Sequence, residues 1–340
     1  MEITHLPISY WLSENGSKLL KGRTEANATD DDNCDVDEDF LMVLLPIIYS
    51  FIFLTGLISN IFALLIFFFL KTKKNSIHVY LINMAFADLL LIICLPFRIA
   101  HHANHNKWML GALFCKIIGV LFYMNMYVSI TLLGFISLDR YLKIIKPLQH
   151  YKLQEVTRSS MICGTLWCVS ILASIIMIFM NKSTDKLTTK CFHYRSINTV
   201  TAIMHLLLVL VFWIVFFLLI WSYAKIAKKL SKLSKEKPGF SNKKMLNNVV
   251  MKTFIIPFIF TICFAPFHIF RLFYVASQLR QTDCNWKNVV NKTNEITLLF
   301  SAFNSCLDPI MYFLLSKTVR RTVLSVISGK FQKELRSETS

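Results

Sequence analysis

Charged residues are scarce in this chain. They make up 17% of its 340 residues, whereas a soluble domain usually carries about a quarter. Apolar residues account for 55%. So much apolar surface cannot be hidden in one compact core, so the shortage of charge argues against a soluble protein and for a protein surrounded by lipid.

Acidic residues are the scarcer kind of charge. The chain has 20 Asp and Glu against 37 Lys and Arg, which gives a formal net charge of +17. A nucleic-acid-binding protein could carry this charge, but a membrane protein acquires it from basic cytoplasmic loops. The Lys and Arg residues gather between apolar stretches, so we expect membrane lipids and not nucleic acid as partners.

Motifs of two other protein classes are missing as well. The sequence contains neither the His-Glu-x-x-His nor the Gly-x-Ser-x-Gly pattern of hydrolases, so we do not expect an enzyme. A retinal-binding protein needs a Schiff-base lysine in its last span, and none occurs in 296–315.

Seven apolar segments are each long enough to cross a bilayer, which takes about 20 residues of helix. Hydrocarbon offers backbone groups no water, and strand-like alternation is absent, so each segment must be helical. The sequence predicts an all-α membrane protein with an N-terminal tail (1–40), a seven-helix bundle (41–315) and a C-terminal segment (316–340). The predicted spans are 41–70, 77–100, 112–145, 159–180, 200–230, 248–277 and 293–315.

Basic residues predict the orientation. Lys and Arg collect after the first, third, fifth and seventh spans, all on one side, which is therefore cytoplasmic. The opposite side carries an acidic tail and the glycosylation sequons at Asn15, Asn27 and Asn181. A fourth sequon, at Asn291, lies too close to the last span for us to expect a glycan there. Residues 1–40 lack an apolar signal-peptide core, so we expect a plasma-membrane protein anchored by its first span, with its N-terminus outside.

Nine cysteines divide by compartment. Five lie in predicted spans and are expected to be buried thiols: Cys94, Cys163, Cys168, Cys263 and Cys306. The other four face the oxidising outside, and four cysteines permit three pairings. Cys115 with Cys191 would tie the loop after the fourth span over the mouth of the bundle, and Cys34 with Cys284 would then tether the N-terminal tail.

Ionisable residues within spans are costly and usually functional. Asp88 lies in the second span and Asp308 in the seventh. Two neighbouring buried carboxylates cannot both stay ionised unless a cation or a proton intervenes. A sodium ion is one hypothesis and a shared proton is the alternative; we expect no other cofactor. Neutral oxygens for a sodium ion could come from Asn60, Ser129, Asn304 and Ser305.

Several landmarks recur in an order typical of one receptor family. They are Asn60, Asp88, Asp139-Arg140-Tyr141, Trp167, Cys263-Phe-Ala-Pro266 and Asp308-Pro309-Ile-Met-Tyr312. From about residue 41 to 331 the chain therefore resembles the rhodopsin-like (class A) G-protein-coupled receptors. The resemblance implies a receptor that passes an extracellular signal to a heterotrimeric G protein.

The resemblance also implies roles in activation. Arg140, between Asp139 and Tyr141, is expected to reach toward the G protein when the sixth helix swings outward. Tyr223 and Tyr312 are expected to support the opened state. Pro266 should kink the sixth helix, and Pro309 belongs to the activation motif of the seventh.

This sequence departs from the family pattern at two places. Phe264 replaces the usual tryptophan two residues before Pro266, and the fifth span lacks its customary proline. Both changes concern the details of the activation switch. The segment 316–331 resembles the family's amphipathic helix on the inner leaflet.

A narrower resemblance is to the purinergic-receptor-like branch, and within it to receptors for lysophosphatidylserine. It is carried by Asp308 in place of asparagine, Phe267-His268-Ile-Phe-Arg271, Leu121-Phe-Tyr-Met-Asn-Met-Tyr127 and Cys191-Phe-His-Tyr-Arg195. It implies an anionic lysophospholipid as the ligand and an inhibitory G protein as the partner.

Seven residues form the ligand site that this resemblance implies. Arg98 and Arg271 would bind phosphate and carboxylate oxygens. Glu295 would answer the ligand's ammonium group, and Asn294 would add a neutral hydrogen-bonding group. The set is completed by Tyr123 and Tyr127, spaced i and i+4, and by His268, one turn before Arg271.

Other interpretations stay open at the level of sequence. The arginines could instead reach toward lipid headgroups, and a nucleotide or nucleotide sugar would suit them as well as a lysophospholipid. A transporter or channel would share the composition. His101, His102 and His105 have metal-like spacing, but no nearby cysteine or carboxylate completes a site, so we expect them to be solvated.

Overall fold

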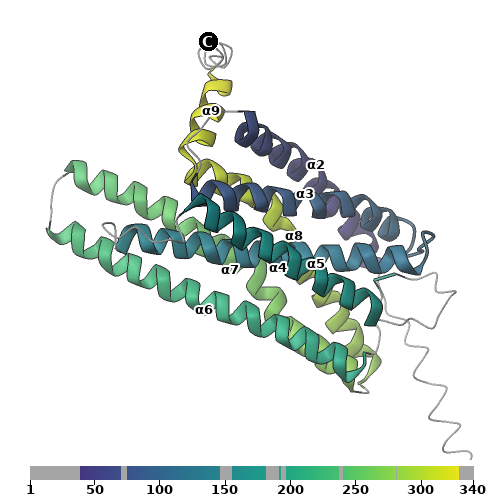
Figure 1. Ribbon diagram of the computed structural model, residues 1–340. Helices are drawn as coiled ribbons and strands as arrows, with labels where there is room; N and C mark the ends of the chain where they lie inside the picture. Colours follow the sequence, from purple (N-terminus) through teal and green to yellow (C-terminus); the bar gives the residue numbers. More distant parts are fainter. Residues whose placement is uncertain are drawn as a thin grey trace, which may run out of the picture.

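The computed structural model describes residues 39–69, 75–145, 155–180, 191–192, 197–236, 240–280 and 282–328. The regular elements within these ranges are helices, which confirms the all-α class (Figure 1). They are α2 (Asp39–Phe69), α3 (Ser76–Ala103), α4 (Ala112–Ile145), α5 (Val156–Met180), α6 (Thr199–Glu236), α7 (Phe240–Leu279), α8 (Cys284–Leu315) and α9 (Lys317–Ile327).

Seven of these helices, α2 to α8, are long and apolar enough to cross a membrane, as predicted. Several extend beyond their predicted ends. The largest difference is in α8, which begins at Cys284 and not at 293. Helices α6 and α7 extend beyond the other helices at the same end of the bundle (Figure 1). An α-helix satisfies its own backbone hydrogen bonds in water as well as in lipid, so the end of an apolar run does not end the helix.

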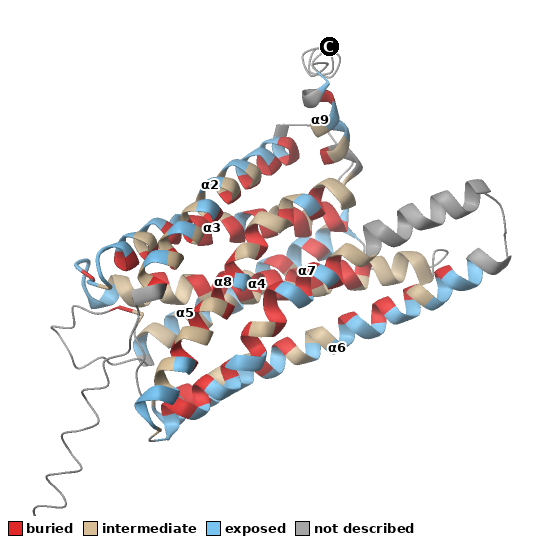
Figure 2. Ribbon diagram, turned by 180° about the vertical axis from the view of Figure 1, so that it is seen from behind, coloured by how far each residue is buried: buried red, intermediate tan, exposed pale blue. Residues whose placement is uncertain are grey.

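Burial separates central from peripheral helices. In the most apolar stretch of α3 and of α4, 56% of the residues are buried, against 6% in α5. Figure 2 shows the buried residues on the faces that meet inside the bundle and the exposed ones outside. Cys168, expected to be buried, is exposed on α5. Its neighbours in the sequence are apolar, but lipid-facing side chains are as apolar as core ones. The sequence therefore could not distinguish a lipid-facing position from a buried one.

Buried polar side chains join helices that are distant in the sequence. The Asn60 amide in α2 donates to the carbonyl oxygens of Gly56, at 3.0 Å, and of Ser305 in α8, at 2.9 Å. The indole Nε1 of Trp167 in α5 donates to Oδ1 of Asn83 in α3 over 2.9 Å. Where water is excluded, such bonds fix which helix faces meet.

The short helix α9 follows a break at Ser316 and turns away from α8 (Figure 1). Val319, Thr322 and Ser325 are buried on one side of it, while Arg321 and Leu324 are exposed. This division is consistent with the amphipathic helix predicted for 316–331, of which 329–331 lie outside the described residues.

Replacing Trp167 with Phe should destabilise the bundle. The Asn83 oxygen would lose its donor from α5, which typically costs about 1 kcal/mol. The midpoint of thermal unfolding of the detergent-solubilised protein should fall accordingly. In an Asn83→Leu background the same change should cost clearly less, and equal losses in both backgrounds would contradict this bond's role.

Candidate functional site

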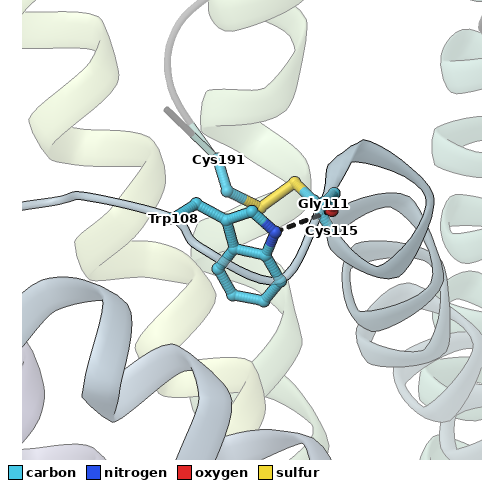
Figure 3. The surroundings of a disulfide bond; sticks show 4 residues. All are labelled: Trp108, Gly111, Cys115 and Cys191. Carbon is cyan, nitrogen blue, oxygen red and sulfur yellow. Dashed lines mark hydrogen bonds between the residues drawn. A yellow bond between two sulfur atoms is a disulfide. The ribbon is translucent and has the colours of Figure 1, made fainter. Parts of the chain in front are cut away.

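A disulfide bond lies at one end of the bundle, here called the disulfide end. It joins Cys115 in the first turn of α4 to Cys191, with their Cα atoms 5.9 Å apart, which confirms the predicted pair. Trp108 lies beside it, and the indole Nε1 of Trp108 donates to the carbonyl oxygen of Gly111 over 2.8 Å (Figure 3). Gly111 has a φ of +82°, which suits glycine in this turn.

The second predicted disulfide can be followed on one side only. Cys284, the first residue of α8, is disulfide-bonded. Its proposed partner, Cys34, lies outside the described residues, as do the sequons at Asn15, Asn27 and Asn181. Asn291 is only 1% exposed within α8, so a glycan on it is incompatible with this packing.

Arg98 in α3 is enclosed beneath the disulfide end and is 3% exposed. Its Nη1 donates to the hydroxyl of Tyr49 over 3.3 Å, and its Nη2 lies 3.7 Å from Oε2 of Glu295. The ring centroids of Phe122 and Phe192 each lie 4.5 Å from its Cζ. Phe192 has a φ of +58°, an uncommon conformation of the kind that clusters at binding sites. Arg98 therefore points into the bundle, not toward lipid headgroups.

Arg271 in α7 lies on the other side of the same interior and is 6% exposed. Its Nη1 donates to Oδ1 of Asn294 over 3.0 Å. Its Nη2 is 3.4 Å from both ring nitrogens of His205 in α6. The rings of Tyr274 and Tyr123 flank it, with their centroids 4.8 Å and 5.4 Å from Cζ. These direct contacts are with groups that carry no negative charge, while the Glu295 carboxyl interacts with Arg271 electrostatically from farther away.

A continuous line of contacts joins the two arginines. Arg271 binds Asn294, whose Nδ2 donates to Oε1 of Glu295 over 3.5 Å, and Glu295 faces Arg98. All four side chains are buried. The line holds two permanent positive charges and one carboxylate, so it has an excess of positive charge that favours an anion.

His268 and Tyr127 lie farther from the disulfide end than this line of contacts. The His268 ring is stacked on Phe212, with centroids 3.8 Å apart, and meets Tyr127 edge-on at 5.7 Å. Nδ1 of His268 donates to the carbonyl oxygen of Phe264 over 2.8 Å. In the neutral ring Nε2 is then the acceptor nitrogen, and it has no hydrogen-bond partner among the described residues.

Five side chains at this site escaped the sequence analysis: Tyr49, Phe122, Phe192, His205 and Tyr274. Tyr49 and His205 are polar residues inside apolar spans, and that property could have marked them. Phe192 is adjacent to the disulfide cysteine Cys191, but nothing in the sequence indicates that its ring covers Arg98.

The expectation of solvated histidines is wrong for two of the three. His101 and His102 are 3% and 6% exposed in the last turn of α3, whereas His105 is exposed. The ring of His101 packs edge-on against Phe192 at 5.4 Å. Both positions lie on the face of α3 that packs against aromatic side chains, and ring contacts of this kind favour burial of the imidazole rings. Among the described residues, no group of three His, Cys, Asp or Glu side chains could hold a metal ion.

A second buried cluster surrounds the two carboxylates in the middle of the bundle. Asp88 and Asp308 are fully buried, and their carboxyl groups lie close enough to interact electrostatically. Oδ2 of Asp88 accepts from the Tyr312 hydroxyl over 3.2 Å, and Oδ2 of Asp308 accepts from the Asn304 amide over 2.8 Å. The buried oxygens that lack a hydrogen-bond partner within the described chain include Asp88 Oδ1, Asp308 Oδ1 and Asn304 Oδ1, and also Ser129 Oγ in α4.

The opposite end of the bundle is here called the Arg140 end. Nη2 of Arg140 donates to the carbonyl oxygen of Leu315 over 3.2 Å. The preceding Asp139 is 1% exposed and is bound by Ser76 and Lys143. The sequence alone did not reveal these two partners of Asp139, one from α3 and one from the next turn of α4.

The other predicted activation residues are distributed between these two regions. Tyr141 packs against Trp221, with ring centroids 5.2 Å apart. Tyr223 is buried, and its ring centroid lies 5.7 Å from that of Phe254. Phe264 is buried in α7, which also contains Pro266, and Pro309 lies inside α8.

Seven spanning helices, with buried charged side chains near one end and the sequence Asp139-Arg140-Tyr141 at the other, are the features that the predicted receptor class requires. The family model of the "7 transmembrane receptor (rhodopsin family)" matches residues 59–312. The chain therefore belongs to this family, whose members are multi-pass membrane receptors for ligands and act through G proteins. It is a receptor and not an enzyme, as predicted.

Three relatives show which receptors of this family the chain is similar to. "Probable G-protein coupled receptor 34" of Mus musculus is 47% identical over 312 residues, which are 91% of this chain and 83% of that protein. The receptor named purinoceptor 14 of Bos taurus is 34% identical over 305 residues, with 87% and 89% covered. The receptor named purinoceptor 13 of Homo sapiens is 34% identical over 301 residues, with 84% and 82% covered.

Replacing Glu295 with Gln should destabilise the ligand-free receptor. Both arginines would be left buried without a counter-charge, a loss of about 3 kcal/mol for a broken buried pair. The midpoint of thermal unfolding in detergent measures the effect. The matched control is Glu155→Gln, because Glu155 pairs with Arg158 at 3.8 Å on the exposed surface. That change should cost under about 1 kcal/mol. Equal losses for the two variants would mean that Glu295 stabilises the receptor no more than an exposed ion-pair partner does.

Proposed function

We propose that this protein is a receptor for an anionic lysophospholipid, lysophosphatidylserine, and that it signals through an inhibitory G protein. The observation that carries the proposal is the line Arg98–Glu295–Asn294–Arg271. It presents two guanidinium groups and one carboxylate, all buried, in one interior.

The charges of the ligand headgroup complement those of the pocket. Lysophosphatidylserine carries a phosphodiester, a carboxylate and an ammonium group, so two anionic groups can meet the two arginines and the cation can meet Glu295. Arg binds such oxygens in bidentate fashion. The apolar chain would lie against the exposed apolar faces of α5 and α6, which carry Ile171 and Leu172, and Leu206 and Leu207.

The orientation of the receptor follows from its basic residues. Arg158, Lys225, Lys228 and Lys229 are exposed toward the Arg140 end, and short basic segments stay in the cytoplasm. The disulfide end, the tail 1–40 and the ligand site would then be extracellular at the plasma membrane, while 316–340 would be cytoplasmic. An oxidising outside agrees with the bond between Cys115 and Cys191.

A nucleotide or nucleotide sugar is the second candidate ligand. Two of the relatives are named purinoceptors, and phosphates would suit Arg98 and Arg271. Glu295 favours the lysophospholipid, because a polyphosphate has no cation to offer it and would be repelled by it.

Lysophosphatidylserine should stimulate GDP release from an inhibitory G protein, and Arg271→Ala should abolish the response while surface expression persists. The measurement is nucleotide exchange in cells and its sensitivity to pertussis toxin. Arg280→Ala is the matched control, since Arg280 is exposed at the end of α7 and should be dispensable. Activation by ADP or a sugar nucleotide, with no response to the lipid, would reject the ligand assignment.

We also propose that the mid-bundle cluster binds a sodium ion. Oxygens are the ligands that hard cations prefer, and the four unpartnered oxygens on Asp88, Asp308, Asn304 and Ser129 offer such a set. The ion would balance charge between two carboxylates that cannot otherwise both ionise. A proton shared by Asp88 and Asp308 is the alternative.

Sodium should therefore raise the midpoint of thermal unfolding relative to choline at equal ionic strength, because a ligand that binds the folded state stabilises it. Asp88→Asn should remove the difference. Asp283→Asn should leave it unchanged, because Asp283 is exposed at the N-terminus of α8. Identical midpoints in sodium and choline for the unaltered protein would favour the shared proton.

A further inference from the structure

Asp139 is held in a closed ring of three side chains at the Arg140 end. Its Oδ1 accepts from the Ser76 hydroxyl over 2.6 Å, and its Oδ2 accepts from Nζ of Lys143 over 2.7 Å. The Lys143 ammonium also donates to the Ser76 hydroxyl oxygen over 3.4 Å. Both carboxylate oxygens are therefore occupied, by the start of α3 and by the next turn of α4.

Arg140 lies outside this ring although it is adjacent to Asp139 in the chain. Its Nη2 bonds to the carbonyl oxygen of Leu315 at the end of α8, and its Nε has no partner among the described residues. In the described part of the chain, no ion pair joins Arg140 to a carboxylate. The cation adjacent to the acid is thus not the cation that neutralises it.

Helix geometry explains this choice. Lys143 follows Asp139 by four residues, so the two side chains lie one above the other on the same face of α4. Arg140 follows by one residue and projects from another face. The sequence offers Arg140 few other acids, because α7 contains neither Asp nor Glu and α6 has only its last residue, Glu236.

Removing the counter-ion of a buried carboxylate is strongly destabilising. Asp139 is 1% exposed, and the charge of the adjacent Arg140 already acts on it. If the Lys143 ammonium were removed, Arg140 would be the cation within the described residues that is placed to replace it. Arg140 would then be drawn toward Asp139 and away from the cytoplasmic opening, where it is expected to meet the G protein.

We infer that Lys143 is a positioning residue, which neutralises Asp139 through the ring with Ser76 and so keeps Arg140 available to the G protein. The inference rests on the proposed coupling function of Arg140 and adds the regulation of that residue. Lys143 acts through Asp139, not by contact with the partner protein.

Lys143→Gln should lower both agonist-independent and lysophosphatidylserine-stimulated GDP release about fivefold, the lower range of typical coupling between sites. The assay uses the full-length receptor in nanodiscs with a purified inhibitory G protein. Lys143→Arg should restore most of the release, because it keeps the pair with Asp139. Arg158→Gln is the control, since it removes an exposed cation from the same end without touching Asp139.

The deciding comparison is the Asp139→Asn background, in which Lys143→Gln should have no further effect. A fivefold loss in that background too would mean that Lys143 contacts the G protein directly, and would overturn the inference. Unchanged release by Lys143→Gln in the unaltered background would overturn it as well. Lys143→Met, which keeps the apolar stem, serves if the Gln variant does not fold.

A failure of the proposed function would give results that differ from a failure of the inference about Lys143. If the unaltered receptor releases no GDP from any G protein, with or without lipid, the coupling function fails and the inference falls with it. If the lipid has no effect but basal release is present, only the ligand assignment fails, and the basal measurements still decide the role of Lys143.

Discussion

A charged side chain inside this bundle has almost no water to solvate it, so its partner must come from a neighbouring turn or another helix. This constraint selects the contacts that hold the functional regions in place. Glu295 in α8 faces Arg98 in α3, and Asp139 binds Ser76 across the junction of α3 and α4. Because an unpaired buried charge is so costly, these few contacts restrict how the helices can pack.

Charge is nevertheless unbalanced at three levels of the bundle, and each imbalance has its own chemical consequence. Near the disulfide end, Arg98 and Arg271 share Glu295, which leaves an excess of positive charge and favours an anion. In the middle, Asp88 and Asp308 face each other and require a cation or a proton. Near the Arg140 end, two cations compete for one buried acid. A soluble protein would screen such imbalances with water, whereas here they become places where binding or rearrangement changes the energy.

The rest of the architecture keeps these groups away from water. Apolar side chains of α5 and α6 face outward, and the central helices α3 and α4 carry much of the buried surface. Aromatic rings complete the enclosure at the disulfide end, where Phe122 and Phe192 cover Arg98. Enclosure by rings leaves the charge in place while excluding solvent, so the arginine keeps its affinity for an anion or for Glu295.

The four outer cysteines left three pairings open in the sequence, and the structure shows the bond between Cys115 and Cys191. The seven spans and the presence of ionisable groups at particular depths, in contrast, could be predicted from the sequence. These features depend on apolar length and on residue type along the chain, which are local properties. It placed Arg98, Arg271, Asn294 and Glu295 in one site only through a resemblance to known receptors. The packing of the helices was needed to show that Tyr49 and Phe192 complete that site, that His101 and His102 are buried, and that Asp139 binds Lys143 in preference to Arg140. Those outcomes depend on which helix faces meet and how each helix is rotated about its axis, and no single segment contains that information.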